Sequence, residues 1–101
     1  MVMNMLAAEG QAASILGAGL AIAGIALATA FIVFGAARGI SNIAGKAVEN
    51  IARQPEASGS IFTTTVVTSA LIEGFTFFAI VVCLLSMGNL ESLIKLVLGI
   101  T

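Results

Sequence analysis

The residue of this sequence with the clearest capacity for chemistry is Glu73, the only charged residue between Ser58 and Leu90. An ionised carboxylate at the centre of a bilayer is costly, and insertion scales give about 2.5–3.5 kcal/mol for Asp there. Because burial disfavours the charged form, we expect Glu73 to be neutral against lipid or protein and to ionise where water or a cation reaches it. That is the chemistry of a reversible proton carrier. The alternative is a structural carboxyl that caps a helix, but no helix end is predicted near position 73.

Glu73 lies in the second of two long apolar runs, and the first, Ala12–Ala37, carries no charge. At a rise of about 1.5 Å per residue, each run is long enough to cross a hydrocarbon core of about 30 Å. Charged residues make up 9% of the chain, against about a quarter in soluble domains. The sequence therefore predicts an all-α membrane protein in a single domain.

A polar segment separates the runs and contains the only proline, Pro55. Proline disfavours helix at the residue before it and ends the incoming hydrogen-bond ladder. We predict a two-transmembrane-helix hairpin, with one helix over about 12–52, a polar loop at 53–56 and a second helix over about 57–88. Residues 89–101 are too short to span the bilayer, and their helical apolar spacing predicts a short interfacial segment.

The positive charges give an orientation. Lys46 and Arg53 flank the loop, residues 1–12 carry no Lys or Arg, and the C-terminal tail carries only Lys95. The positive-inside rule places the loop in the cytoplasm and both termini outside. Four Lys and Arg residues cannot form the basic track that nucleic acid requires. The lone Cys83 and the absence of His give no basis for a metal site, and we predict no cofactor.

Small residues alternate near the loop end of the first helix, at Gly35, Ala37, Gly39 and Ser41. Residues two apart are about 200° apart around a helix, so these four form two narrow faces on nearly opposite sides. In lipid, small residues let helix backbones approach closely. Two opposed contact faces predict two like neighbours, which favours a ring over a dimer.

The stretch Ala44-Gly-Lys-Ala-Val-Glu-Asn-Ile-Ala-Arg-Gln-Pro-Glu-Ala57 resembles the polar loop of the c subunit of F-type ATP synthases, whose hallmark is Ala-Arg-Gln-Pro. The alternating small residues resemble the glycine repeat of the same family. Glu73 falls at the family's essential carboxylate. The similarity extends over about Gly35–Leu85 without a gap.

The resemblance implies a cylindrical homo-oligomeric ring of hairpins, with the first helix inside and the second outside. Such a ring rotates against a stator a subunit that supplies an essential Arg. Glu73 would exchange protons there, so that proton flow drives rotation and ATP synthesis, or ATP hydrolysis drives pumping. The loop residues Arg53, Gln54 and Pro55 would contact the central-stalk gamma and epsilon subunits. The chain would be a non-catalytic subunit of an enzyme complex, surrounded by membrane lipids in the bacterial plasma membrane.

Sodium-coupled members of the family resemble one another in a Gln on the first helix and in a Ser and a Thr after the Glu. Those positions fall at Ile40, Gly74 and Phe75 here, and the aromatic residue that buttresses the Glu falls at Phe78, which lacks a hydroxyl. The resemblance therefore favours protons, with a sodium-coupled ring as the alternative. The residues expected to line the site are Ile40, Ser69, Leu71, Gly74, Phe75, Thr76 and Phe78. Of these, Ser69 and Thr76 share a helical face with Glu73 and could bond its carboxyl or the helix backbone.

Arg38 departs from the family, which usually has an apolar residue there. By hairpin pairing it lies within a turn of the depth of Glu73, and a permanent ion pair would keep that carboxylate ionised. Arg38 is about 160° around the helix from Ile40, the position expected to face the second helix. We expect Arg38 and Asn42 to form a polar belt inside the ring, balanced by anionic lipid headgroups, water or another component. The alternative is that Arg38 snorkels to the cytoplasmic surface.

Other classes of membrane protein are less consistent with these features. A small proton-coupled transporter also uses a membrane Glu, but such proteins have more spans per chain. A structural proteolipid or a pore-forming holin does not explain a lone buried carboxylate. The proteolipids of vacuolar-type ATPases are closer, but the Arg-Gln-Pro loop favours the F-type.

Overall fold

The computed structural model describes residues Met1–Ile100, and the secondary structure in this range is entirely helical. Helix α1 spans Val2–Arg53, the 3-10 turn η1 spans Pro55–Ala57, and helix α2 spans Ser58–Leu98. Both α-helices are long and apolar enough to cross a membrane, judged by length and composition. The all-α prediction is confirmed.

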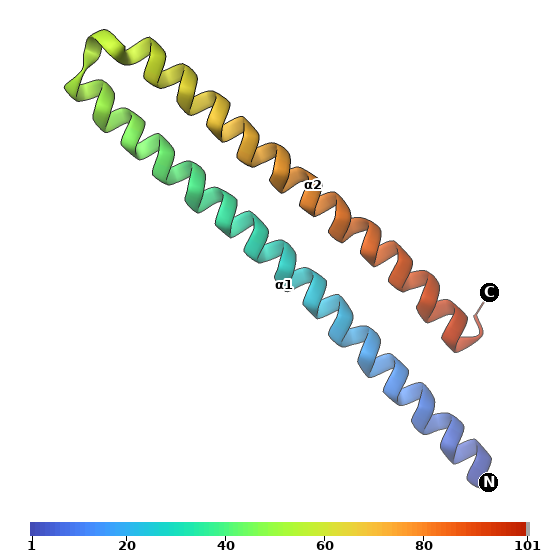
Figure 1. Ribbon diagram of the computed structural model, residues 1–101. Coiled ribbons are helices and arrows are strands. Elements are labelled where there is room, and N and C mark those ends of the chain that lie inside the picture. Colours follow the sequence, from blue (N-terminus) through green and yellow to red (C-terminus); the bar gives the residue numbers. More distant parts are fainter. Residues whose placement is uncertain (101) are drawn as a thin grey trace. The chain divides into compact units, whose positions relative to one another are not determined.

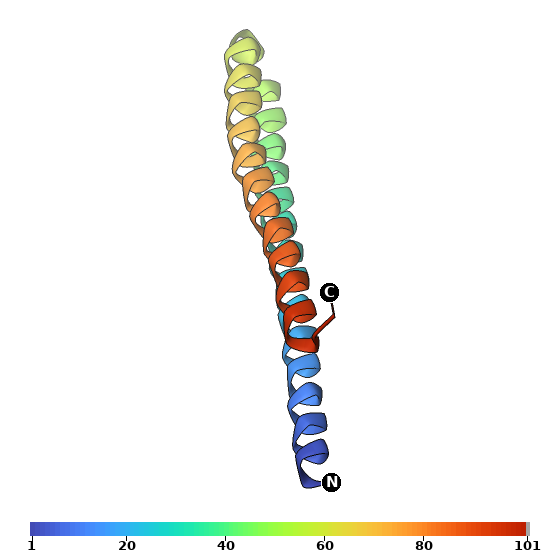
Figure 2. The ribbon, with the colours of Figure 1, turned by 90° about the vertical axis from the view of Figure 1, so that its right-hand side faces the viewer.

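The chain divides into two units, Ala30–Ile80 and a second unit formed by Met1–Thr29 with the residues from Val81 onward. In Ala30–Ile80, the end of α1 and the start of α2 run antiparallel from the turn (Figure 1). The view turned by 90° also shows these two segments side by side (Figure 2). This unit is a helical hairpin, and it contains Glu73.

The turn of the hairpin is tight, because α1 ends at Arg53 and η1 begins at Pro55, so that only Gln54 lies between them. Gln54 leaves the helix with φ −134° and ψ 72°, as a residue before proline is expected to do. Its N–H donates to the Asn50 carbonyl at 2.8 Å, and the Ala57 N–H donates to the Gln54 carbonyl at 3.0 Å. Pro55 begins η1, where its missing N–H leaves no helical bond unmade. The proline therefore fixes the chain reversal.

Half-buried residues at intervals of three or four form the facing sides of the two helices in this unit. On α1 they are Ile32, Ala36, Gly39, Ile40, Ile43 and Ile51, with the buried Ala47 among them. On α2 they are Ile61, Thr65, Thr68, Ser69, Ile72, Thr76, Ala79 and Ile80. A Cβ atom built on Gly39 would lie 3.8 Å from the Ile72 Cδ1 atom, so Gly39 lies beside the Ile72 side chain at the interface of the two helices. Most other side chains of the unit are exposed, so its apolar surface must be covered by lipid or by other chains.

The second unit contains the start of α1 and the end of α2. Helix α1 begins at Val2, before the start expected near position 12, and α2 continues through Gly88 and Asn89 to Leu98. Neither Gly88 nor Asn89 removes a backbone donor, and the only proline is at position 55, so the hydrogen-bond ladder is not interrupted. The segment after residue 88 therefore differs from the separate helix that we expected, and its place at the membrane interface stays a prediction.

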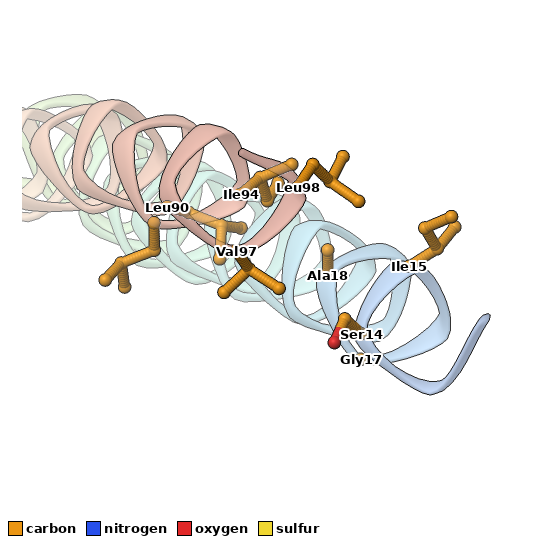
Figure 3. A pocket seen from close by; sticks show the side chains of 9 residues that line it. Ser14, Ile15, Gly17, Ala18, Leu90, Ile94, Val97 and Leu98 are labelled. Atoms are coloured by element: carbon orange, nitrogen blue, oxygen red, sulfur yellow. The ribbon is translucent and has the colours of Figure 1, made fainter. Parts of the chain in front are cut away.

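Helix α2 ends at Leu98, and Gly99 follows it with a φ of 67°, the left-handed conformation that favours glycine. The Ile100 N–H donates to the Lys95 carbonyl at 3.0 Å, which satisfies one of the last carbonyls. An apolar groove lies between the two helix ends of this unit (Figure 3). It is lined by Ser14, Ile15, Gly17, Ala18, Leu90, Leu93, Ile94, Val97 and Leu98.

Candidate ion-binding site

Glu73 lies about 22 Å along α2 from its start at Ser58. Its side chain is exposed and borders an open groove of the Ala30–Ile80 unit. The other residues that line this groove are Ala36, Ala70, Gly74, Thr76, Phe77 and Ile80. Only Thr76 among them has a polar side chain. Within one chain, the site is therefore a single carboxyl group in an apolar groove.

The Thr76 hydroxyl is used by the helix itself, because its Oγ1 donates to the Ile72 carbonyl at 2.7 Å. The same bond to the carbonyl four residues earlier is made by Thr63, Thr65 and Thr68. Such bonds satisfy a hydroxyl in an apolar environment. Of the two partners expected for the Thr76 hydroxyl, the Glu73 carboxyl and the helix backbone, the structure shows the backbone.

We expect Thr76→Val to leave ion binding at Glu73 nearly unchanged, because valine removes a hydroxyl whose proton goes to the backbone. A net hydrogen bond is worth about 1 kcal/mol, so the pumping rate should change by less than about fivefold. ATP-driven pumping by reconstituted enzyme measures this. Thr65→Val is the matched control, because Thr65 makes the same 2.7 Å bond to Ile61 away from Glu73. A much larger loss for Thr76→Val than for Thr65→Val would make Thr76 a ligand of the ion.

Of the expected lining residues, the structure brings Gly74 and Thr76 to the groove with Glu73. Ile40 and Ser69 are half-buried on the facing sides of the two helices instead. The remaining three are exposed and lie about 140–200° around α2 from Glu73, on its opposite flank; they are Leu71, Phe75 and Phe78.

Four lining residues were not expected: Ala36, Ala70, Phe77 and Ile80. Helical spacing could have identified the three on α2, because positions three before, four after and seven after Glu73 lie on its face. Ala36 comes from α1, so finding it requires the pairing of the two helices. The unexpected aromatic neighbour is thus Phe77, and Phe78 lies elsewhere on the helix.

The alternating small residues are placed on the two flanks of α1. Gly35 and Gly39 lie on one flank and Ala37 and Ser41 on the other, each roughly 60–140° from the side that faces α2. Gly39 is half-buried against Ile72, whereas the other three are exposed. A Cβ atom on Gly35 would meet nothing within 4 Å. Both flanks are therefore open in a single chain.

Arg38 lies at the same level as Glu73, since each is about fifteen residues from the turn end of its helix. It is nevertheless exposed on the side of α1 away from α2, where it lines a polar groove with Asn42, Lys46 and Glu49. In the described part of the chain, the ion pairs are Arg53–Glu49 at 2.6 Å and Lys95–Glu91 at 2.8 Å. Arg38 is thus not paired with the Glu73 of its own chain.

The turn presents polar groups at the end of the hairpin. Arg53 is held by Glu49 one helical turn earlier, and Gln54 and Pro55 are exposed. The three residues stand together at the tip of the unit, where another protein could reach them.

Two long apolar helices joined by a polar turn, with one carboxyl midway along the second, define the class of two-helix membrane hairpins. Residues 22–86 match the family of ATP synthase c subunits. No solved structure matches the chain.

Several curated relatives are c subunits of ATP synthases. The one from Phocaeicola vulgatus is 50% identical over 70 residues, which cover 69% of this chain and 83% of the relative. The one from Bacteroides thetaiotaomicron is 49% identical over 67 residues, which cover 66% and 79%. The one from Ruminiclostridium cellulolyticum is 52% identical over 68 residues, which cover 66% and 90%. The chain belongs to the family of ATP synthase c subunits.

Proposed function

We propose that Glu73 carries the ion that this subunit translocates, and that the ion is a proton. Family membership makes the chain a subunit of a membrane rotor ring for ion translocation, which assembles with other ATP synthase subunits. The observation that carries the proposal is the single acidic side chain midway along α2. It lies in a groove whose other lining residues, apart from Thr76, are apolar. Such a group is neutral when covered and ionises when water reaches it.

The walls of the groove favour a proton over a sodium ion. A metal cation that leaves water must find several oxygen atoms to replace its hydration. Gly74, Phe77 and Ile80 in the groove offer no side-chain oxygen, and the Thr76 hydroxyl donates to Ile72. Ile40 and Phe75, which lie outside the groove, offer none either. A neutral carboxylic acid needs no such ligands, so the apolar walls suit a bound proton.

Neighbouring copies complete the site in this proposal. Glu73 is on one flank of α2, and Leu71, Phe75 and Phe78 are exposed on the opposite flank. In a closed ring of identical chains, each contact joins one flank of a copy to the other flank of the next. The three apolar side chains of one copy would then cover the Glu73 of its neighbour. This explains why they belong to the expected lining and yet do not gather within one chain.

The same arrangement gives the working cycle. Glu73 loses its proton near the essential Arg of a stator a subunit, gains another from an aqueous half-channel, and crosses the lipid-facing arc covered and neutral. Each proton that crosses 100 mV supplies about 2.3 kcal/mol, so several must cross for each ATP made. The tip at Arg53, Gln54 and Pro55 transmits rotation to the gamma and epsilon subunits of the central stalk. Lys46 and Arg53 favour a cytoplasmic tip in a bacterial plasma membrane, with both termini outside.

A carbodiimide, which attacks protonated carboxyls in apolar surroundings, tests the identity of the carrier and of the ion. In membranes that contain the assembled enzyme, we expect one adduct, at Glu73, and a parallel loss of ATP-driven proton pumping. Glu56 and Glu91 are exposed acids near the helix ends and serve as internal controls that stay unlabelled. Mass spectrometry of the extracted chain locates the adduct.

Sodium distinguishes the two candidate ions in the same assay. If the carrier binds protons, NaCl at constant pH and ionic strength leaves the labelling rate of Glu73 unchanged. If sodium slows the labelling strongly relative to potassium, the proton assignment is wrong. Absence of any adduct at Glu73 would contradict the carrier role itself.

A further inference from the structure

The side of α1 that faces away from α2 changes character at Arg38. Towards the turn it is polar, with Arg38, Asn42 and Glu49 lining one groove. Lys46 lies at the edge of this groove, on a flank of α1 where it also borders Ile61 and Thr64 of α2. Towards the N-terminus it is apolar and aromatic, with Phe34 68% exposed and Phe31 72% exposed. All of these residues belong to the Ala30–Ile80 unit. One continuous face therefore has a sharp boundary between a polar and an apolar zone.

The polar zone carries uncompensated positive charge. Glu49 is held by Arg53 at 2.6 Å, so it is already matched to one cation. Arg38 and Lys46 have no ion-pair partner among the residues that the structure describes. A guanidinium placed this far from the turn requires an anion or good hydration, because an unpaired charge in apolar surroundings is strongly unfavourable.

The exposed side of α2 has its boundary at a different level. Near the turn, α2 exposes Phe62 together with Thr63 and Thr64, and beside the stretch of α1 from Asn42 to Lys46 it exposes Val66 and Val67. The polar zone of α1 therefore extends about 7 residues, or about 10 Å, farther from the turn than that of α2. One flat membrane surface cannot match both boundaries. The two sides of the hairpin must face environments whose polar layers lie at different depths.

We propose that Arg38, Asn42 and Lys46 bind the phosphate headgroup of an anionic phospholipid, whose acyl chains lie along Phe34 and Phe31. The occupant must be anionic to match the two free cations, and it must carry an apolar tail to cover the adjoining aromatic rings. The Arg38 guanidinium donates two parallel hydrogen bonds to phosphate oxygens, the Asn42 amide donates another, and Lys46 adds a point charge. A free phosphate ion would leave the aromatic zone uncovered.

The location of this lipid inside the ring rests on the proposed function, which places α1 there. Each copy adds two cations to the same enclosed space, where like charges repel. An anionic lipid on each copy removes that repulsion. The phosphate also neutralises the charge of Arg38, which lies at the same level as Glu73, so that the carboxyl stays free to gain and lose its proton.

The direct test is a solid-state NMR distance measurement between arginine nitrogen and lipid phosphorus. The chain has two arginines, so Arg53→Gln leaves Arg38 as the only arginine that isotope labelling marks. Rings of this variant are reconstituted in phosphatidylglycerol vesicles in phosphate-free buffer. We expect a nitrogen-to-phosphorus distance of about 4 Å, as in a hydrogen-bonded guanidinium–phosphate pair. The matched control is Arg38→Gln, which leaves only Arg53, and it should show no such distance.

A second measurement counts the lipids that stay with the purified ring by mass spectrometry. Removing one cation near a lipid phosphate is expected to weaken retention of phosphatidylglycerol about fivefold, and Arg38→Gln with Lys46→Gln more strongly. Lys95→Gln, which removes a cation already paired with Glu91, should retain lipid like the unmodified chain. Equal retention in all variants, or an Arg38 nitrogen next to the Glu73 carboxyl and not to phosphorus, overturns the proposal.

Carbodiimide labelling of the same samples separates this inference from the proposed function. If Glu73 is labelled but no lipid phosphorus lies near Arg38, the lipid site alone is wrong. If lipid is bound but Glu73 is never labelled, the carrier role is wrong and the lipid site stands. If Arg38→Gln rings do not assemble, the distance measured in the Arg53→Gln ring decides the matter.

Discussion

Glu73→Gln is expected to abolish ion translocation while the ring still assembles. The amide has nearly the shape of the acid but cannot release a proton. No other acidic or basic side chain of the Asp, Glu, Lys, Arg or His type lies between residues 58 and 90 to replace it, so the loss should reach background, at least about 100-fold. ATP-driven pumping into vesicles by the reconstituted enzyme measures the loss, and gel mobility of the undissociated ring measures assembly.

Two further variants make this result specific. Glu73→Asp keeps the acid but withdraws it by one methylene from its groove, so we expect reduced but measurable pumping. Glu91→Gln removes an acid of the same type from the exposed pair with Lys95, and pumping should be normal because exposed pairs contribute less than about 1 kcal/mol. Substantial pumping by Glu73→Gln would show that another group carries the ion.

The helices and their turn could be predicted because each depends on local features of the sequence. The apolar runs exceed what a bilayer requires, and Pro55 cannot continue a helix. The ends of the helices were harder to predict, since nothing at Gly88 or Asn89 forces a helix to stop. Helix ends without a proline depend on small differences in free energy, about 1 kcal/mol for a glycine.

The site was predictable only in part for a related reason. The carboxyl itself is conspicuous, because a charge in the middle of an apolar run is unfavourable wherever the helix packs. Its surroundings depend on which faces meet, as Phe77 and Phe78 illustrate. These adjacent residues differ by about 100° around α2, and the structure places Phe77 in the groove with Glu73. Residues of another copy of the chain that surround Glu73 cannot be predicted from one sequence unless the arrangement of the copies in the ring is known.

Arg38 and Glu73 illustrate how two charges can share a level without pairing. The hairpin places them at the same distance from the turn, but Arg38 is on the face of α1 opposite α2, and Glu73 is on a flank of α2. The apolar helix interface at Gly39 and Ile72 lies at that level. Separate faces thus allow a permanent cation at the level of a carboxyl that, in the proposed function, gains and loses a proton.

Gly35→Leu is expected to prevent ring assembly without unfolding the hairpin. Within the chain, nothing lies within 4 Å of a Cβ at Gly35, so the larger side chain meets no obstacle until a second copy approaches. Overpacking of a close contact costs about 1–3 kcal/mol, and in a ring the substitution occurs at every interface. Gel mobility of the undissociated oligomer should show loss of the ring, while circular dichroism of the detergent-solubilised chain shows unchanged helix content.

Two comparisons locate the cause of that loss on the flank of α1. Gly35→Ala adds one methyl group, the smallest increase in volume that the flank contact can be given, and should assemble. Gly45→Leu introduces the same large side chain on the face opposite α2, away from both flanks, and should also assemble. Gly39→Leu is less informative, because a side chain at this position contacts Ile72 inside the hairpin itself. Normal rings from Gly35→Leu would show that this flank does not meet a neighbour, and would remove the reason for placing Leu71, Phe75 and Phe78 against the next copy's Glu73.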